Sequence, residues 1–183
     1  ILVTQFHSLF PNQVDIIHNT FPYFDGGASI SRTARPYPSW LVFKPIMIFT
    51  SFLLIKYWIY NREIINFFSK DHKNIKKIFF FGVASAIFLT LHSIFLGIKF
   101  DIQIYKLMRR VVLLLFIIFE IIAQGMLVYH FFKIKDKISG FINKKILILK
   151  AILVSVLATV AILSLPILLD KGNTHFKHAL EWN

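Results

Sequence analysis

The chain has 183 residues, of which 56% are hydrophobic and only 16% are charged, and its formal net charge is +12. Soluble proteins carry about 25% charged residues, so we expect this chain to cover its apolar surface with lipid. It contains no cysteine, which excludes disulfides, thiolate metal sites and a cysteine nucleophile. The Lys and Arg residues stand between hydrophobic runs without interleaved exposed aromatics, so we expect no nucleic-acid partner.

The first 39 residues are predicted to form a non-cytoplasmic loop segment at the membrane surface. The stretch Asp25-Gly26-Gly27 is a turn signal, and the residues before Pro22, Pro36 and Pro38 are pushed to extended conformations. The simplest interpretation is a folded cap that covers the helix ends. A compatible second role is binding of an anionic lipid headgroup, because forked arginine cations beside hydroxyl groups suit a phosphate. The candidate headgroup-binding residues are Ser29, Ser31, Arg32, Thr33 and Arg35.

Four hydrophobic runs between residues 40 and 169 are each long enough to cross a bilayer, which takes about 20 apolar residues in a helix. Backbone polar groups cannot be left unpaired in hydrocarbon, and the runs show no period-two alternation of the kind found in barrels. The sequence therefore predicts an all-α fold, a polytopic transmembrane helix bundle with four helices visible. The runs are Trp40–Tyr60, Ile78–Ile98, Val111–Phe132 and Ile146–Leu169.

The first run has aromatic residues at both ends. Trp40 begins it, and Tyr57, Trp58 and Tyr60 close it. Aromatic side chains of this kind favour the membrane–water interface. We expect these four residues to form interfacial belts.

The connections between the runs are short and basic. Residues 61–77 and 133–145 carry five cations each, and with four helices they share one side of the membrane. The opposite side has slightly fewer cations over more residues. The excess of positive charge places 61–77 and 133–145 in the cytoplasm by a thin margin.

Polar residues inside the third run are candidate functional positions. Glu120 lies near its middle, and Gln124 follows one turn later on the same face. A charge at this depth costs about 2.5–3.5 kcal/mol, so Glu120 should have a partner. The candidates are His92 in the second run and His130 in the third. Such a pair could carry a proton, bind a polar lipid group or, most commonly, hold helices together.

Small residues recur at helical spacing on two of the runs, which is typical of closely packed membrane helices. We predict two packing stripes, with no function assigned to them. One consists of Gly82, Ala86, Thr90, Ser93 and Gly97, and the other of Ala151, Ser155 and Thr159.

Residues 170–183 are predicted to form a non-cytoplasmic stretch that leads into a further helix. They contain His175, His178 and Glu181, which are weak candidates for metal ligands. On one helix these three would spread over about 120°, and a catalytic site would need further ligands such as His18 or Asp25. The chain has none of the usual nucleophile-elbow, phosphate-loop or metalloprotease motifs.

Three short elements together resemble a known family. They are "SIS" at residues 29–31 before a membrane helix, "TLHSIF" at 90–95 and "HALEWN" at 178–183. The chain resembles the DRAM-like family, which includes the FGF-receptor-activating protein, the damage-regulated autophagy modulators and the factor that acts on GPI-anchored proteins after lipid attachment. The resemblance implies six helices in the intact protein and a role in lipid-anchor remodelling or membrane trafficking. The Gly26-Gly27 pair and the arginines after "SIS" depart from it.

The leading hypothesis from the sequence is a non-catalytic or weakly catalytic membrane protein that binds or handles lipid headgroups. Its expected partners are anionic membrane lipids, and no cofactor or catalytic residue is assigned. One alternative is a structural or accessory subunit of a larger membrane complex, which would add other membrane subunits as partners. A second alternative is a metal-dependent lipid hydrolase or acyltransferase.

Overall fold

The computed structural model describes residues 21–27, 30–34, 39–69, 71–96, 103–138, 140, 142–169, 175, 178 and 179. Within these ranges every regular element is a helix. Four of the helices are long and apolar enough to cross a membrane. The prediction of an all-α polytopic bundle with four visible helices is therefore confirmed.

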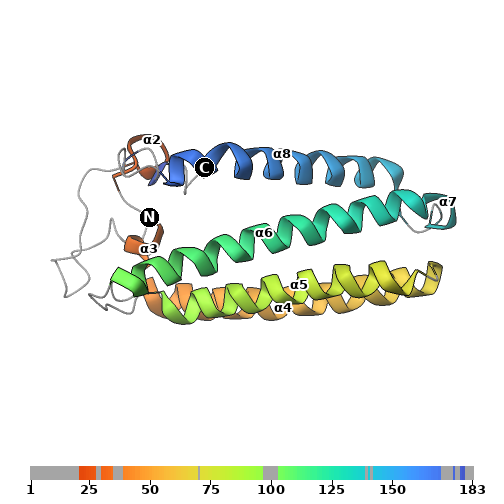
Figure 1. The fold of residues 1–183 in the computed structure, drawn as a ribbon, viewed down its shortest axis with the longest axis horizontal. Helices are drawn as coiled ribbons and strands as arrows, with labels where there is room; N and C mark the ends of the chain where they lie inside the picture. Colours follow the sequence, from red (N-terminus) through yellow and green to blue (C-terminus); the bar gives the residue numbers. More distant parts are fainter. Residues whose placement is uncertain are drawn as a thin grey trace.

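The four long helices form an elongated bundle that has short helices at both ends (Figure 1). α4 and α5 lie side by side, α6 packs on them, and α8 lies on the other side of α6. The short helices α2 and α3 lie at one end, and α7 lies at the other. The bounds are α2 Pro22–Asp25, α3 Ile30–Thr33, α4 Ser39–Phe68, α5 His72–Phe95, α6 Gln103–Lys133, α7 Lys135–Ile138 and α8 Lys144–Leu169.

The connection between α4 and α5 is much shorter than predicted. It comprises residues 69–71 instead of 61–77, because α4 continues past its last apolar run. A charged residue does not end a helix when its long side chain can lie along a neighbour. Arg62 does this, with its guanidinium 4.5 Å from the centroid of the Phe79 ring on α5.

The two basic connections lie at the same end of the bundle, as predicted. Lys133, at the end of α6, has its Nζ 3.7 Å from the Asp71 carboxylate, and Lys137 of α7 donates a 3.5 Å hydrogen bond to the carbonyl of Phe68. Asp71 also caps α5, where it accepts hydrogen bonds from the Asn74 side chain (2.7 Å) and backbone (3.4 Å). The Asn74 side chain, its backbone N–H and Lys133 hold the pKa of Asp71 below its usual 3.8.

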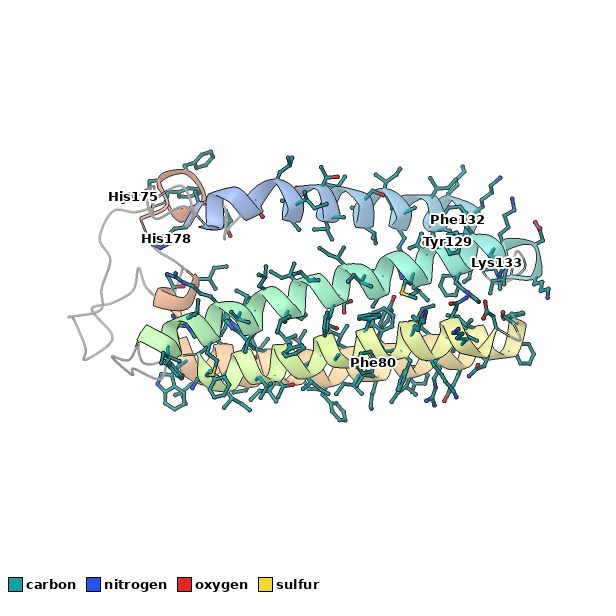
Figure 2. The ribbon with its side chains drawn as sticks, viewed as in Figure 1. Phe80, Tyr129, Phe132, Lys133, His175 and His178 are labelled. Atoms are coloured by element: carbon teal, nitrogen blue, oxygen red, sulfur yellow. The ribbon has the colours of Figure 1, made fainter. Side chains whose placement is uncertain are left out.

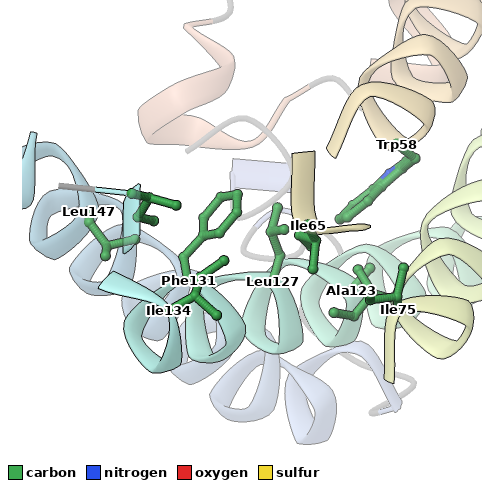
Figure 3. Packing of buried hydrophobic residues seen from close by; sticks show 10 residues of the cluster. Trp58, Ile65, Ile75, Ala123, Leu127, Phe131, Ile134 and Leu147 are labelled. Atoms are coloured by element: carbon green, nitrogen blue, oxygen red, sulfur yellow. The ribbon is translucent and has the colours of Figure 1, made fainter. Parts of the chain in front are cut away.

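A buried hydrophobic cluster joins α4, α5, α6 and α8 near the basic end (Figure 3). Trp58 is fully buried in it, so the prediction of an interfacial position for Trp58 is wrong. The reason is the length of α4, which puts Trp58 ten residues before the helix end. Of the predicted belt residues, Trp40 and Tyr60 are exposed. The cluster contains Trp58, Ile65, Ile75, Ile78, Ala123, Leu127, Phe131, Ile134, Ile138 and Leu147.

The first predicted stripe of small residues packs against α4 at Gly82 and Thr90, whereas its last member, Gly97, lies outside the described residues. A Cβ added to Gly82 would collide with the Trp58 ring. Ala86 is also fully buried, and the hydroxyl of Thr90 donates a 2.8 Å hydrogen bond to that of Ser51. The absence of a side chain at Gly82 therefore lets α4 and α5 approach closely, as small residues do in membrane bundles.

Of the three residues in the second predicted stripe, only Ala151 is partly buried. Ser155 and Thr159 on α8 are exposed, whereas Val154 and Ala158 are half-buried like Ala151. On the inward side of α8, Leu147 belongs to the buried cluster and Lys150 contacts Tyr57 of α4. Small size alone did not identify the packed face.

Candidate functional site

Glu120 lies inside the membrane-spanning part of α6 and is hydrogen-bonded on both carboxylate oxygens. Its Oε2 lies 2.6 Å from the Ser85 hydroxyl of α5. Its Oε1 accepts a 2.7 Å hydrogen bond from the amide nitrogen of Gln124, one turn later. Ser85 is fully buried and Glu120 is half-buried. The expectation that Glu120 has a partner is met by these two residues.

The hydrogen bonds continue from Gln124 to the other two long helices. The amide oxygen of Gln124 accepts a 3.2 Å hydrogen bond from the Tyr57 hydroxyl of α4. Lys150 of α8 donates to the same hydroxyl at 2.6 Å, and its Nζ lies 5.3 Å from the Tyr57 ring centroid. We call the five residues Lys150, Tyr57, Gln124, Glu120 and Ser85 the polar network.

The polar network links all four spanning helices within the membrane. It places a cationic group at one end and a carboxyl group at the other, with two polar side chains between them. Because polar groups have no water partners in hydrocarbon, such a chain gives each member at least one hydrogen-bond partner. Chemically, it can hold a proton on Glu120, orient a polar ligand or fix the rotation of α8.

Neither predicted histidine pairs with Glu120. Seven residues separate His92 from Ser85 along α5, or about 10 Å, and ten residues separate His130 from Glu120 along α6, or about 15 Å. These distances are too long for contact. Among the described residues, His92 Nδ1 and His130 Nε2 are buried without a hydrogen-bond partner. The predicted Glu–His pair is therefore wrong.

The structure tests little of the predicted headgroup site. Ser29 and Arg35 lie outside the described residues, as do the side chains of Ser31 and Arg32. Thr33 is described, and its hydroxyl donates to the carbonyl of Ile30 at 2.9 Å within α3. The headgroup site stays a prediction.

The turn after α2 packs against the C-terminal stretch, at the end of the bundle where Figure 2 labels His175 and His178. The ring nitrogen Nδ1 of His175 lies 3.3 Å from the carbonyl oxygen of Asp25, and that of His178 lies 3.0 Å from the carbonyl oxygen of Gly26. A carbonyl only accepts hydrogen bonds, so each Nδ1 carries the proton. We call the turn at residues 25–27 together with His175 and His178 the cap; residues 1–20, 28, 29 and 35–38 of the predicted loop segment lie outside the described residues.

Asp25 shapes this turn. Its carboxylate accepts hydrogen bonds from the backbone N–H of Gly27 (2.8 Å) and of Phe21 (2.7 Å). These bonds, the Gly27 bond foremost, and the nearby His175 lower the pKa of Asp25 from its usual 3.8. Asp25 is therefore an ionised turn residue at neutral pH.

The described residues hold no group of three His, Asp or Glu side chains that could bind a metal ion. His175 and His178 direct Nδ1 to backbone carbonyls. Glu181 and His18 lie outside the described part of the chain. The contacts thus give the two histidines a structural role in the cap.

Replacement of Gly26 by alanine is expected to detach the cap. Gly26 has φ +59°, and a Cβ there would meet the backbone of His175. A non-glycine residue in this conformation costs about 1–2 kcal/mol, which corresponds to about 5–30-fold faster local opening. Hydrogen–deuterium exchange of the peptide that contains His175 and His178 measures it. Gly140→Ala is the control, since a Cβ there meets nothing, and equal exchange in both variants would contradict the prediction.

Comparison with protein-family models, with curated proteins and with solved structures gave no match. The resemblance to the DRAM-like family accordingly stays a prediction. The described part of the chain has four helices long and apolar enough to cross a membrane, and the polar network links them. The chain is an integral membrane protein.

Proposed function

We propose that this membrane protein binds anionic lipid headgroups at the end of the bundle that carries α2 and α3. The observation that supports the proposal is an aromatic cluster at the start of α2. Phe21 and Phe24 stack with ring centroids 5.4 Å apart, and Phe24 is 86% exposed. A phenylalanine this exposed at the end of a membrane bundle is best accommodated in the lipid interface. The cap would then lie at headgroup level.

Cations at the same end supply the charge. Arg110 is exposed and Arg109 half-buried near the start of α6, whose first turns are tied to α5 by the Tyr105 hydroxyl, which donates to the Phe95 carbonyl at 2.7 Å. Arg32 and Arg35 flank the end of α3 in the sequence. Forked guanidinium groups match a phosphate. The resemblance to a lipid-remodelling family is consistent with this ligand class.

The double variant Arg32→Ala with Arg35→Ala is expected to weaken binding of phosphatidylglycerol roughly 30-fold, since each cation near an anionic surface contributes about 1 kcal/mol. Native mass spectrometry of the detergent-extracted protein, titrated with this lipid, measures the loss. The matched control is Lys144→Ala with Lys145→Ala, a pair of exposed cations at the other end. An equal loss in both variants, or no loss in either, would count against the proposal.

The positive charge of the connections at the α7 end supports a cytoplasmic location for that end and a non-cytoplasmic location for the cap. The chain lacks cysteine, so a single cysteine in place of the exposed Gly140 reports the side directly. An impermeant thiol reagent added to intact cells should leave it unlabelled. Labelling would show the opposite orientation, with the cap in the cytoplasm.

A second candidate function is that of an accessory subunit. α8 packs mainly on α6, and most of its apolar side chains are uncovered, such as Ile162 at 66% and Leu163 at 67% exposed. Lipid or a partner helix could cover this surface. A native mass that contains other chains at a fixed ratio would favour the subunit, whereas this chain with bound phospholipid alone would favour the headgroup protein.

A further inference from the structure

The Ser85 hydroxyl has one proton but lies within hydrogen-bond distance of two oxygen atoms. Its Oγ lies 2.7 Å from the carbonyl oxygen of Gly82 and 2.6 Å from Glu120 Oε2. A serine hydroxyl donates one hydrogen bond, and a carbonyl oxygen only accepts. If Glu120 is ionised, Ser85 can donate to one of the two acceptors. If Glu120 is protonated, it donates to Ser85, which donates to Gly82, and both contacts are hydrogen bonds.

The other carboxylate oxygen of Glu120, Oε1, is the last acceptor in a chain of hydrogen bonds, and the donor of each bond in this chain is determined. Lys150 can only donate, so the Tyr57 hydroxyl accepts from it and donates to the Gln124 oxygen. The Gln124 nitrogen then donates to Glu120 Oε1. Dipoles aligned from a cation toward a carboxylate stabilise the anion. The site thus accommodates ionised Glu120 as well, after rotation of one hydroxyl.

We infer that Glu120 is a proton-binding site inside the membrane, and that its protonation releases Lys150 and so loosens α8 from α4. Protonation removes the negative charge toward which the chain of donors points. Lys150 would then be a cation in the bilayer with only the Tyr57 hydroxyl and ring as partners. Such an arrangement is costly.

Lys150 has an alternative position available. It lies six residues after the start of α8, or about 9 Å from the basic end of the bundle. A lysine stem can extend toward the interface over part of that distance. Only 6% of the residues in the apolar window of α8 are buried, and Leu153 and Leu157 beyond Lys150 are exposed, so few packing contacts oppose a shift of this part of the helix.

The titratable groups around Glu120 are few among the described residues. α4 contributes Tyr57 and α8 contributes Lys150, whereas α5 faces Glu120 with Ser85, which does not titrate near neutral pH. His92 on α5 and His130 on α6 lie about 10 Å or more away along their helices. Because either histidine also titrates, a pH response by itself does not identify Glu120, and the test therefore includes a variant of Glu120.

Distances between two spin labels test the inference. The chain has no cysteine, so Phe52→Cys on α4 and Leu157→Cys on α8, both exposed, carry the only labels. In lipid nanodiscs we expect a narrow distance distribution at neutral pH and a longer, broader one at acidic pH. Glu120→Gln should give the acidic distribution at both pH values. Lys150→Met should do the same by a different route.

The control is Glu63→Gln, the same substitution at an exposed position near the end of α4, which should keep the pH response. A parental response in Glu120→Gln and Lys150→Met would overturn the link between Glu120 and α8. Infrared difference spectra between the two pH values test proton binding separately. They should contain a carboxylic-acid carbonyl band that Glu120→Gln loses, and a spectrum without that loss would overturn proton binding at Glu120.

Discussion

Gly82→Ala is expected to destabilise the bundle by about 1–3 kcal/mol. The Cβ that alanine introduces would collide with the ring of Trp58. Trp58 is fully buried and belongs to the cluster that joins the four spanning helices. The ring cannot turn aside within a packed core, so α4 and α5 have to move apart. Thermal unfolding in detergent, followed by circular dichroism, should show a lower midpoint.

Gly125→Ala supplies the matched control, because Gly125 is also inside a spanning helix but a Cβ there meets nothing within 4 Å. Alanine favours a helix over glycine by about 1 kcal/mol, so this variant should be neutral or slightly more stable. If Gly82→Ala were as stable as Gly125→Ala, the close contact between Gly82 and Trp58 would not hold in the folded protein.

The number of spanning helices could be predicted from the sequence because length and hydrophobicity alone decide it. The helix ends could not. Arg62 looks like part of a loop when hydropathy is considered, yet its guanidinium lies on the Phe79 ring and α4 continues to Phe68. Whether a long charged side chain near a membrane surface ends a helix depends on the residues of the neighbouring helix. Hydropathy along one segment contains no information about that neighbour.

The polar network could likewise be predicted only in part from the sequence. Glu120 was predicted to need a partner, and Gln124 follows from helical spacing alone. Ser85, Tyr57 and Lys150 depend on the relative rotation and register of three other helices, which no periodicity within one helix gives. The signal available for Lys150 was its charge within an otherwise apolar run.

Lys150 and Glu120 are expected to be coupled in stability although two side chains separate them. Lys150→Met leaves the carboxylate at the end of a donor chain that has lost its cation. Glu120→Gln removes the negative charge that the cation balances. We expect each single variant to be less stable than the parent, and the double variant to recover about 1 kcal/mol relative to the sum of the two. A double-mutant cycle of thermal or denaturant unfolding measures this coupling.

Lys145→Met combined with Glu120→Gln provides the reference, since Lys145 is exposed one turn and a half earlier on the same helix. Its effect should add to that of Glu120→Gln within about 0.5 kcal/mol. If Lys150→Met is coupled to Glu120→Gln but Lys145→Met is not, the loss of a lysine charge nearby is not sufficient for coupling. The two charges would then be coupled through the hydrogen bonds of Tyr57 and Gln124. Additive behaviour for Lys150 would instead reduce the network to independent local hydrogen bonds. In that case α8 would be positioned by the packing of Leu147 in the buried cluster, and the charge on Glu120 would be stabilised by Ser85 and Gln124 alone.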